Sequence, residues 1–480
     1  MTIDQTIDQL FGIMSHWVQS IVFWGPQIGG VDVPLVVVWL AAGAIFFTLY
    51  LNFANIRYFG HALKCLGNAY DEPGARGQTS NFESLSACLS ATIGLGNIAG
   101  VAVAITVGGP GAALWMVLLG FFGMGSKCAE VMMGHKYRQF PDPERPDEVA
   151  GGPMYYLKHA FAIRNFPRVG VVVAALFAVF CIGGALGGGN MFQSNQMYQQ
   201  LVYASGGEQS FFHDKGWLFG LILAVLTGLV TLGGINSIAS VASKLTPIMV
   251  IFYMLCGLCV LGVQHEHLLP ALKTIVTSAF SWDAGLGGFI GAVVAGVKRA
   301  AFSNEAGLGT AAIIQASART DFSARQGLVG GLGPFFDTVV VCFMTALVIV
   351  TSGVYVGHEG VGGIALTSSA FETVLPWFDM ALVVCVALFA YSTIIVYSYY
   401  GEKCVGYLFG DHRATAIGFR VVYLVFVIIG SCVSLGNVID FSESTFLAMA
   451  VPNILGLYFL APEIRKDLNE YLVKMKLRRP

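Results

Sequence analysis

The chain has 480 residues, of which 56% are hydrophobic and only 11% are charged, and its formal net charge is −2. Soluble domains carry about 25% charged residues, so this composition excludes an ordinary soluble protein and predicts an all-α protein that crosses a bilayer several times. The ten cysteines are scattered, mostly within apolar runs, which argues against a disulfide framework.

Apolar runs of about 20 residues predict eleven transmembrane helices. Residues 1–32 precede them as an extracytoplasmic segment that contains a predicted amphipathic helix. The first span and its cytoplasmic loop form residues 33–84 and stand apart from the rest. In chain order, the spans are predicted at residues 33–53, 85–108, 111–134, 169–203, 216–233, 246–263, 288–312, 328–352, 379–401, 415–436 and 444–461.

Lysine and arginine are distributed very unevenly between the two sides of this arrangement. Twenty of the 26 fall in loops on one side, and only Lys215 and Lys273 fall in loops on the other. The positive-inside rule therefore places the C-terminus in the cytoplasm and the N-terminus outside. The basic tail, residues 462–480, suits the anionic inner leaflet and gives no reason to expect nucleic acid. We predict a multi-pass protein of the plasma membrane, the inner membrane of a bacterium.

The second span is interrupted at its centre by Gly94 and Gly96. Each glycine costs about 1 kcal/mol against alanine in a helix, and an unwound turn inside a membrane is tolerated where it lines a cavity. Such a break offers N–H groups, here those of Leu95 and Gly96, to a carboxylate, and carbonyl groups to a cation. Helix packing is the alternative use, because Gly96 and Gly100 have the spacing of a small-xxx-small pair.

The seventh span has a similar interruption between Ala301 and Gly309, with two glycines one residue apart beside an amide and a carboxylate. In the predicted topology the second and seventh spans run in opposite directions, and each opens a unit of five helices. These units cover residues 85–263 and 288–461, joined by an external loop at 264–287. Inverted repeats with a broken helix in each half are typical of secondary transporters with a site near the bilayer midplane.

Several short motifs, all between about residues 80 and 410, occur together: Gly96-Asn97-Ile98-Ala99-Gly100-Val101, Gly108-Gly109-Pro110-Gly111, Gly151-Gly152-Pro153-Met154, Gly189-Asn190-Met191-Phe192-Gln193, Phe302-Ser303-Asn304-Glu305-Ala306-Gly307, Phe336-Asp337-Thr338 and Tyr399-Tyr400-Gly401-Glu402. Together they resemble the signature of the alanine or glycine:cation symporter family. The resemblance implies import of alanine or glycine with sodium, or sometimes protons. It also implies an inverted-repeat 5+5 helix fold of the APC type, similar to that of the neurotransmitter:sodium symporters, with one extra N-terminal span.

The resemblance also implies where the substrate binds. The predicted substrate-binding residues surround the two breaks and are Thr92, Gly94, Leu95, Gly96, Asn97, Gln193, Phe302, Ser303, Asn304 and Tyr397. Tyr397 stands where the family often has tryptophan, and the residues around Gln315 also depart from the usual run, so pocket size and substrate choice are affected. The amides of Gln193 and Asn195 lie inside a span, where linking helices is their alternative role.

By the same resemblance, one sodium ion is predicted beside the first break. Its ligands are hydroxyl oxygens of two adjacent residues in the ninth span and carbonyl oxygens of three others: Ser392 and Thr393, with Ser90, Ile93 and Phe389. The alternative is that the hydroxyls bond carbonyls of their own helix, as serine and threonine often do in membranes.

Ionisable residues inside spans are functional candidates by default. Those predicted to take part in gating are Glu305, Asp337, Lys298 and Arg299. Lys298 and Glu305 are expected to form a structural pair or a gate, and Asp337 to cap or anchor the eighth span. Glu130, beside Lys127, is interpreted as a solvated or interfacial partner.

These patterns predict a secondary active transporter that imports a small neutral amino acid with sodium by alternating access. A proton-coupled symporter, with Glu305 or Asp337 titrating, is the alternative among transporters, and a channel or a non-transporting receptor is the alternative outside them. No catalytic constellation emerges, so neither an enzyme nor an organic cofactor is expected. The expected partners are the amino acid, sodium and the bilayer. One copy of the chain is expected to suffice, and the oligomeric state stays open.

Overall fold

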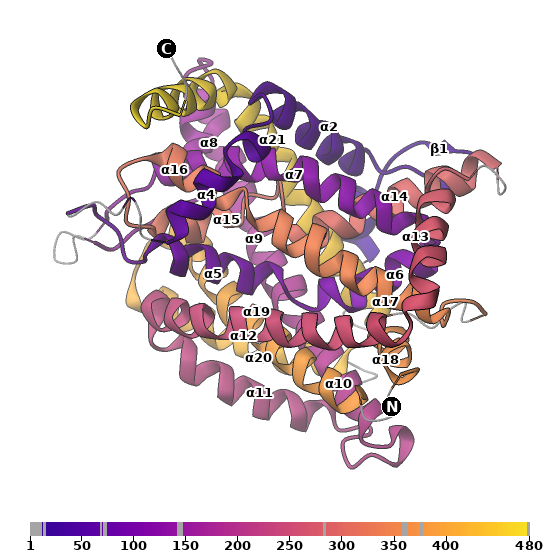
Figure 1. Ribbon diagram of the computed structural model, residues 1–480. Coiled ribbons are helices and arrows are strands. Elements are labelled where there is room, and N and C mark those ends of the chain that lie inside the picture. Colours follow the sequence, from indigo (N-terminus) through magenta and orange to yellow (C-terminus); the bar gives the residue numbers. More distant parts are fainter. Residues whose placement is uncertain are drawn as a thin grey trace.

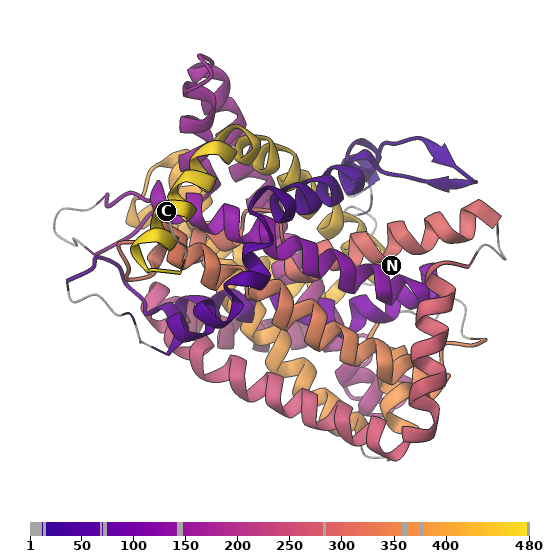
Figure 2. The ribbon, with the colours of Figure 1, turned by 45° about the horizontal axis from the view of Figure 1, so that its top comes forward.

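Helices make up nearly all of the structure. The computed structural model describes residues 12, 16–67, 70, 74–141, 147–281, 285–357, 363–374 and 378–477. Within them the sheet is a hairpin of β1 (Gln27–Ile28) and β2 (Val31–Asp32), antiparallel with Gln27 opposite Asp32. Long helices lie side by side from α2 at one edge to α11 at the other (Figure 1), and the hairpin projects from the body beside the start of α14 (Figure 2).

The helices of the first half are α2 (Leu35–Tyr50), α3 (Ala54–Arg57), α4 (Phe59–Leu66), α5 (Asn81–Thr92), η1 (Leu95–Asn97), α6 (Ala99–Gly108), α7 (Gly111–Lys136), α8 (Pro153–Ala162), α9 (Pro167–Leu186), η2 (Gly187–Met191), α10 (Phe192–Ala204), η3 (Gly207–Gln209), α11 (Gly216–Thr231) and α12 (Gly234–Val263). Those of the second half are α13 (His265–Ala279), α14 (Gly285–Asn304), α15 (Ala311–Ile314), η4 (Gln315–Ser317), α16 (Ser323–Gly330), η5 (Phe335–Cys342), α17 (Phe343–Ser352), α18 (Ile364–Glu372), α19 (Phe378–Phe409), α20 (Arg413–Cys432) and α21 (Leu435–Lys474).

Eight helices of the described chain are long and apolar enough to cross a membrane, and α5 with α6 makes a ninth when counted as one bent span. The other two predicted spans coincide with α2 and α11, which are shorter apolar helices of 16 residues each. Outward-facing side chains such as Val172, Leu229 and Leu255 are more than half exposed, which suits contact with lipid. The structure is therefore that of a multi-pass membrane protein, while the count of eleven and the two five-helix units stay predictions.

Some helices extend beyond the predicted spans. Helix α12 continues through Pro247, and α21 runs unbroken for 40 residues, so that most of the predicted tail at 462–480 is helical. Helix α13 lies in the stretch predicted as an external loop. The predicted N-terminal amphipathic helix falls mostly outside the described residues. Within the part of this segment that is described, residues 16–22 are helical. The last three residues, 478–480, lie outside them too.

Two straight helices, α7 and α19, flank the two interrupted ones. Helix α5 begins at a capping box, in which the Glu83 N–H donates to Ser80 Oγ at 3.2 Å and the Ser80 N–H donates to the Glu83 carboxylate at 2.8 Å. It ends at Thr92, and the chain continues into α6 with a bend of 57°. Helix α7 packs along α14, α15 and α16, whereas α19 packs against α5, α9 and α10. Each break is therefore held against a continuous helix.

Candidate functional site

The first break is closed by the side chain of Asn97. The N–H of Gly94 donates to Asn97 Oδ1 at 3.0 Å and lies 2.9 Å from the carbonyl of Thr92. In a continuous helix the same N–H would donate to the carbonyl of Ser90, four residues earlier. The break therefore releases the Ser90 carbonyl for another partner.

A second amide, from Gln193 on α10, completes this closure. Gln193 Oε1 accepts from the N–H of Leu95 at 3.0 Å, and Gln193 Nε2 donates to the carbonyl of Gly188 at 2.9 Å. No hydrogen bond from the N–H of Gly96 is found within the described chain. Of the two N–H groups predicted to hold a carboxylate, that of Gly96 is open and that of Leu95 is already paired, so Gln193 has to move before both can act together.

The three glycines of this region stand in different surroundings. A Cβ atom added to Gly94 would lie 2.6 Å from Thr393 Oγ1, which is closer than such atoms approach. A Cβ on Gly96 would meet Phe302 and Ser303 at 3.5 Å, an ordinary contact, and one on Gly100 would meet nothing within 4 Å. Gly94 is therefore required for the first break to lie so close to α19. The alternative of helix packing through Gly96 and Gly100 does not account for this contact, because it does not involve Gly94.

Four of the five predicted sodium ligands are joined by hydrogen bonds, and Ile93 is the one that is not. The released carbonyl of Ser90 accepts from Thr393 Oγ1 at 3.0 Å and from Ser392 Oγ at 3.4 Å. Ser392 Oγ also donates to the carbonyl of Phe389 at 3.0 Å, the bond within its own helix that the alternative interpretation expects. Ile93 is buried at the end of α5, and its carbonyl accepts from neither hydroxyl in the described structure.

Asp337, in the π-helical turn η5, joins the two interrupted helices. Its carboxylate accepts from Asn97 Nδ2, Ser303 Oγ and the hydroxyl of Thr338, each at 2.7 Å. Thr338 in turn accepts from Asn304 Nδ2 at 2.9 Å. Asp337 therefore fixes Asn97 of the first break and the end of α14 in one network.

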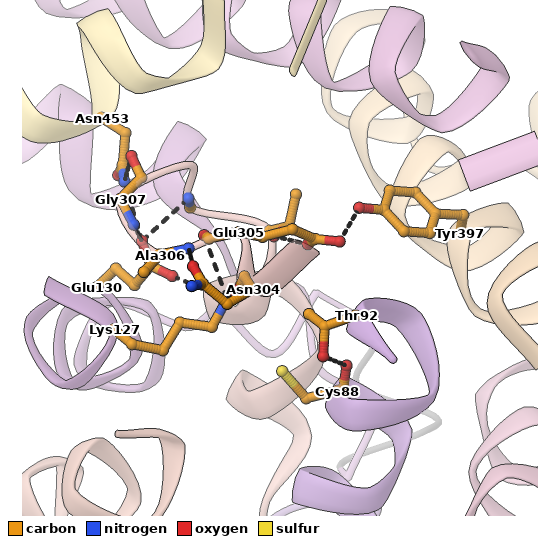
Figure 3. A network of polar contacts seen from close by, with 12 residues as sticks. Cys88, Thr92, Lys127, Glu130, Asn304, Glu305, Ala306, Gly307, Tyr397 and Asn453 are labelled. Carbon is orange, nitrogen blue, oxygen red and sulfur yellow. Dashed lines mark hydrogen bonds and ion pairs between the residues drawn. The ribbon is translucent and has the colours of Figure 1, made fainter. Parts of the chain in front are cut away.

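The second break is held by a buried ion pair from α7. Glu130 Oε2 accepts from the N–H groups of Gly307 and Gly309 at 3.1 and 3.0 Å, and Lys127 Nζ lies 3.4 Å from Glu130 Oε1. Lys127 also donates to the carbonyls of Asn304 and Glu305, which end α14 (Figure 3). Both charged side chains are fully buried, so the interpretation of this pair as solvated or interfacial is wrong.

The second break also releases carbonyl groups. The N–H of Ala306 donates to Asn304 Oδ1 at 2.9 Å instead of to the carbonyl of Phe302, and Gly307 donates to Glu130 instead of to the carbonyl of Ser303. The carbonyls of Phe302 and Ser303 therefore lose their helical donors. By contrast, the hydroxyl of Thr92 donates to carbonyls of its own helix, and the side chains of Ser303 and Asn304 bond within the Asp337 network.

Glu305 connects the second break to α19. Its carboxylate accepts from the hydroxyl group of Tyr397 (Figure 3). It also accepts from the hydroxyl group of Thr310. Its backbone is in the left-handed region at φ 56°, which non-glycine residues rarely adopt. Tyr397 lies directly over Gly189, where an added Cβ would be 2.0 Å from the ring. Gly189 belongs to a π-helical turn, Gly187–Met191, in the continuous helical stretch from Pro167 to Ala204.

The predicted pairing of Lys298 with Glu305 is wrong. Lys298 Nζ lies 3.0 Å from the carboxylate of Glu443 on α21, and Arg299 forms an ion pair with the same carboxylate. Glu305 points instead toward Tyr397, because the left-handed backbone at the break turns its side chain toward α19. Sequence reasoning missed Glu443, although a carboxylate at the start of an apolar span is a detectable signal.

Asn453 is another residue that sequence reasoning missed. It lies within α21, where its Nδ2 donates to the carbonyl of Gly307 at 2.8 Å and to Glu130 at 3.2 Å, and its Oδ1 accepts from the hydroxyl of Tyr156. The signal that could have identified Asn453 is an amide side chain next to a proline within an apolar run. Asn195 takes the linking role, because its Nδ2 donates to the carbonyl of Val433 at 2.7 Å.

Comparison with known proteins identifies the family. The family model described as the sodium:alanine symporter family matches residues 17–479. The chain belongs to this family. The sodium/alanine symporter AgcS of Methanococcus maripaludis is 39% identical over 444 residues, which cover 91% of this chain and 92% of that protein. The probable sodium/glutamine symporter GlnT of Bacillus subtilis is 30% identical, over 92% of this chain and 88% of that protein.

The resemblance drawn from the motifs is thus confirmed. The family and these relatives are transporters, so the chain is an amino-acid transporter of the membrane and not an enzyme. The structure of MhsT in complex with L-phenylalanine matches with a TM-score of 0.53 at 17% identity, over 83% of this chain and 99% of that one. The chain therefore has the fold of the neurotransmitter:sodium symporters.

Proposed function

We propose that this member of the sodium:alanine symporter family imports a small neutral amino acid, alanine or glycine, together with sodium. The observation that carries the proposal is the junction between the first break and α19. There the released carbonyl of Ser90 meets the hydroxyls of Ser392 and Thr393, beside a glycine that allows the close approach. Neutral oxygens from two helices in a buried, compact arrangement suit a small hard cation.

The substrate is bound by both breaks at once. Its carboxylate takes the N–H of Gly96 and, after Gln193 has moved, that of Leu95, where the helix dipole favours negative charge. Its ammonium takes the released carbonyls of Phe302 and Ser303. Because a Cβ atom added to Gly96 would already meet the Phe302 ring at 3.5 Å, there is room beside Gly96 for a short side chain only. Alanine and glycine meet this limit.

Sodium couples to the substrate through the geometry of α5. The ion, held by the carbonyls of Ser90, Ile93 and Phe389 and the two hydroxyls, ties the interrupted helix to the straight helix α19. This tie fixes the position of the break, and with it the N–H groups that hold the carboxylate. Binding of the ion therefore favours binding of the amino acid, and the low internal sodium level favours release of both.

Alternating access requires contacts between helices that break and form again. The bond between Tyr397 and Glu305 joins α19 to the second break, and the contact of Lys298 and Arg299 with Glu443 joins α14 to α21. We assign gating to these contacts. The proposed arrangement has eleven spans in two inverted units of five, with the N-terminus outside a bacterial inner membrane and the C-terminus in the cytoplasm. One copy of the chain contains every residue of the site.

Uptake into proteoliposomes tests this proposal. Radiolabelled L-alanine, glycine and L-glutamine are offered with an inward sodium gradient, with choline in place of sodium, and with an inward proton gradient. We expect accumulation of alanine or glycine above equilibrium with sodium alone. Uptake that follows protons and ignores sodium would contradict the coupling ion, and uptake of glutamine alone would contradict the substrate.

Variants of the hydroxyl pair separate the ion site from general packing. Ser392→Ala and Thr393→Ala are expected to raise the sodium concentration needed for half-maximal uptake. Ser398→Ala is the matched control, because Ser398 is a buried serine of the same helix whose hydroxyl donates to the carbonyl of Ile395. An equal change of sodium dependence in all three variants would contradict the assigned site.

A further inference from the structure

One aromatic ring joins the two rings that were predicted to face the substrate. Phe446 of α21 is 2% exposed, and its ring centroid lies 5.1 Å from that of Phe302 and 5.7 Å from that of Tyr397. It stacks on Tyr397 with an angle of 14° between the planes. Phe192 packs edge-on against Phe302 at 5.2 Å. Phe446 is thus the side chain that links Phe302 of α14 with Tyr397 of α19.

Phe446 rests on backbone that carries no side chains. A Cβ atom on Gly188 would lie 2.6 Å from Phe446 Cζ, and one on Gly184 would lie 2.8 Å from Phe446 Cδ1. Tyr397 rests on Gly189 in the same way. Both rings therefore pack directly on the backbone of α9 and η2 at these glycines. This contact prevents either ring from moving further toward α9 and η2.

In the proposed function Phe302 lies beside the substrate, and the position of its ring depends on what lies behind it. Its ring lies at 3.5 Å from the Cβ position of Gly96 on one side and against Phe446 on another. Protein interiors are packed closely, so removal of a ring leaves a void into which its neighbours can turn. A smaller residue at position 446 would let Phe302 or Tyr397 move away from the substrate space.

We propose that Phe446 sets the largest side chain that the pocket accepts, by holding Phe302 and Tyr397 in place. It is a positioning residue and acts through those two rings. The inference rests on the proposed function for the location of the substrate. It adds a determinant of substrate size on α21, a helix that supplies none of the predicted substrate-binding residues.

The first test enlarges the pocket. In Phe446→Leu and Phe446→Ala, we expect the kcat/KM for leucine or valine, divided by that for alanine, to rise by about tenfold or more, the scale of one methylene in an apolar pocket. The control is Phe441→Leu, because Phe441 is a buried phenylalanine of the same helix that rests over Gly187. It should leave this ratio unchanged. A ratio that stays at the wild-type value in both Phe446 variants, while they still transport glycine, would overturn the inference.

The second test moves the ring in the opposite direction. Gly188→Ala places a methyl group against Phe446 and presses the ring toward Phe302. Transport of alanine should fall relative to glycine, and Phe446→Leu in the same chain should restore it by making room for the methyl group. Restoration by Phe441→Leu instead, or by neither variant, would contradict the inference.

Binding gives a readout that does not depend on transport. The rise in melting temperature of the detergent-solubilised protein is measured with a series of glycine, alanine, valine and leucine in sodium buffer. The largest amino acid that stabilises the protein should be larger for the Phe446 variants than for the wild type. If the wild type bound alanine but transported none, the proposed function would be contradicted. The size limit measured from the melting temperatures would still test the role of Phe446. An unchanged size limit would overturn the inference.

Discussion

The two helix breaks are held in contrasting ways. At the first, neutral amides of Asn97 and Gln193 accept from the N–H groups of Gly94 and Leu95. At the second, the carboxylate of Glu130 accepts from two N–H groups, and the ammonium of Lys127 donates to two carbonyls. A neutral hydrogen bond is readily exchanged for one to a substrate, whereas a buried charge without its partner is very costly. The first break is built to exchange partners, and the second to keep its shape.

This difference explains why both breaks occur in one site. An amino acid presents a carboxylate and an ammonium, and the carboxylate must replace a group that already accepts hydrogen bonds. In the proposed binding mode the ammonium takes the carbonyls of Phe302 and Ser303, and Lys127 and Glu130 hold the backbone that presents these carbonyls. Variants that remove one partner from each break test this division, and their expected effects decrease in the order given below.

The largest effect is expected for Glu130→Gln. The amide can still accept from Gly307 or Gly309, but Lys127 loses its counter-charge in the interior, which costs about 3–5 kcal/mol in the free energy of unfolding. Denaturation in detergent micelles measures this loss. Glu470→Gln is the control, because Glu470 pairs with Lys466 on the exposed end of α21. A Glu130→Gln variant as stable as the control would contradict the role of charge at the second break.

The next effect is expected for Gly94→Ala. The added methyl group overlaps Thr393 Oγ1, and overpacking of this kind costs about 1–3 kcal/mol. Because the overlap falls on the proposed sodium site, sodium-dependent uptake should be lost even where the protein folds. Gly100→Ala, whose methyl group meets nothing, should transport like the wild type. Normal sodium dependence in Gly94→Ala would show that the contact with α19 is dispensable.

A smaller effect on stability than that of Glu130→Gln is expected for Gln193→Leu, which removes only neutral hydrogen bonds. The N–H of Leu95 loses its acceptor and the carbonyl of Gly188 loses its donor, a net change of about 1–3 kcal/mol for the two bonds. An amino acid then binds without displacing Gln193, so ligand should raise the melting temperature of this variant by more than it does for the wild type. If Gln193→Leu destabilised the protein as much as Glu130→Gln, the contrast between the breaks would fail.

The sequence predicted both breaks but not the groups that hold them. Paired glycines inside apolar runs mark where a helix unwinds, and Ser392 with Thr393 marks an oxygen-rich turn, because these signals are local. The partners Glu130, Glu443 and Asn453 come from other helices, and hydropathy does not distinguish a charge at the end of a span from a buried one. Lys298 was paired with Glu305 by proximity along the chain, whereas the fold pairs it with Glu443. The family resemblance supplied the function class, and the packing around Phe446 came only from the structure.

Hydrogen exchange at the two breaks tests whether the first break exchanges partners while the second keeps its shape. The protein is exchanged in nanodiscs with choline, with sodium, and with sodium and alanine, and protection is compared for peptides that cover 93–98 and 305–310. Sodium and alanine together should slow exchange strongly at the first break and leave exchange at the second, already protected, unchanged. Protection that rises at the second break and not at the first would contradict this expectation.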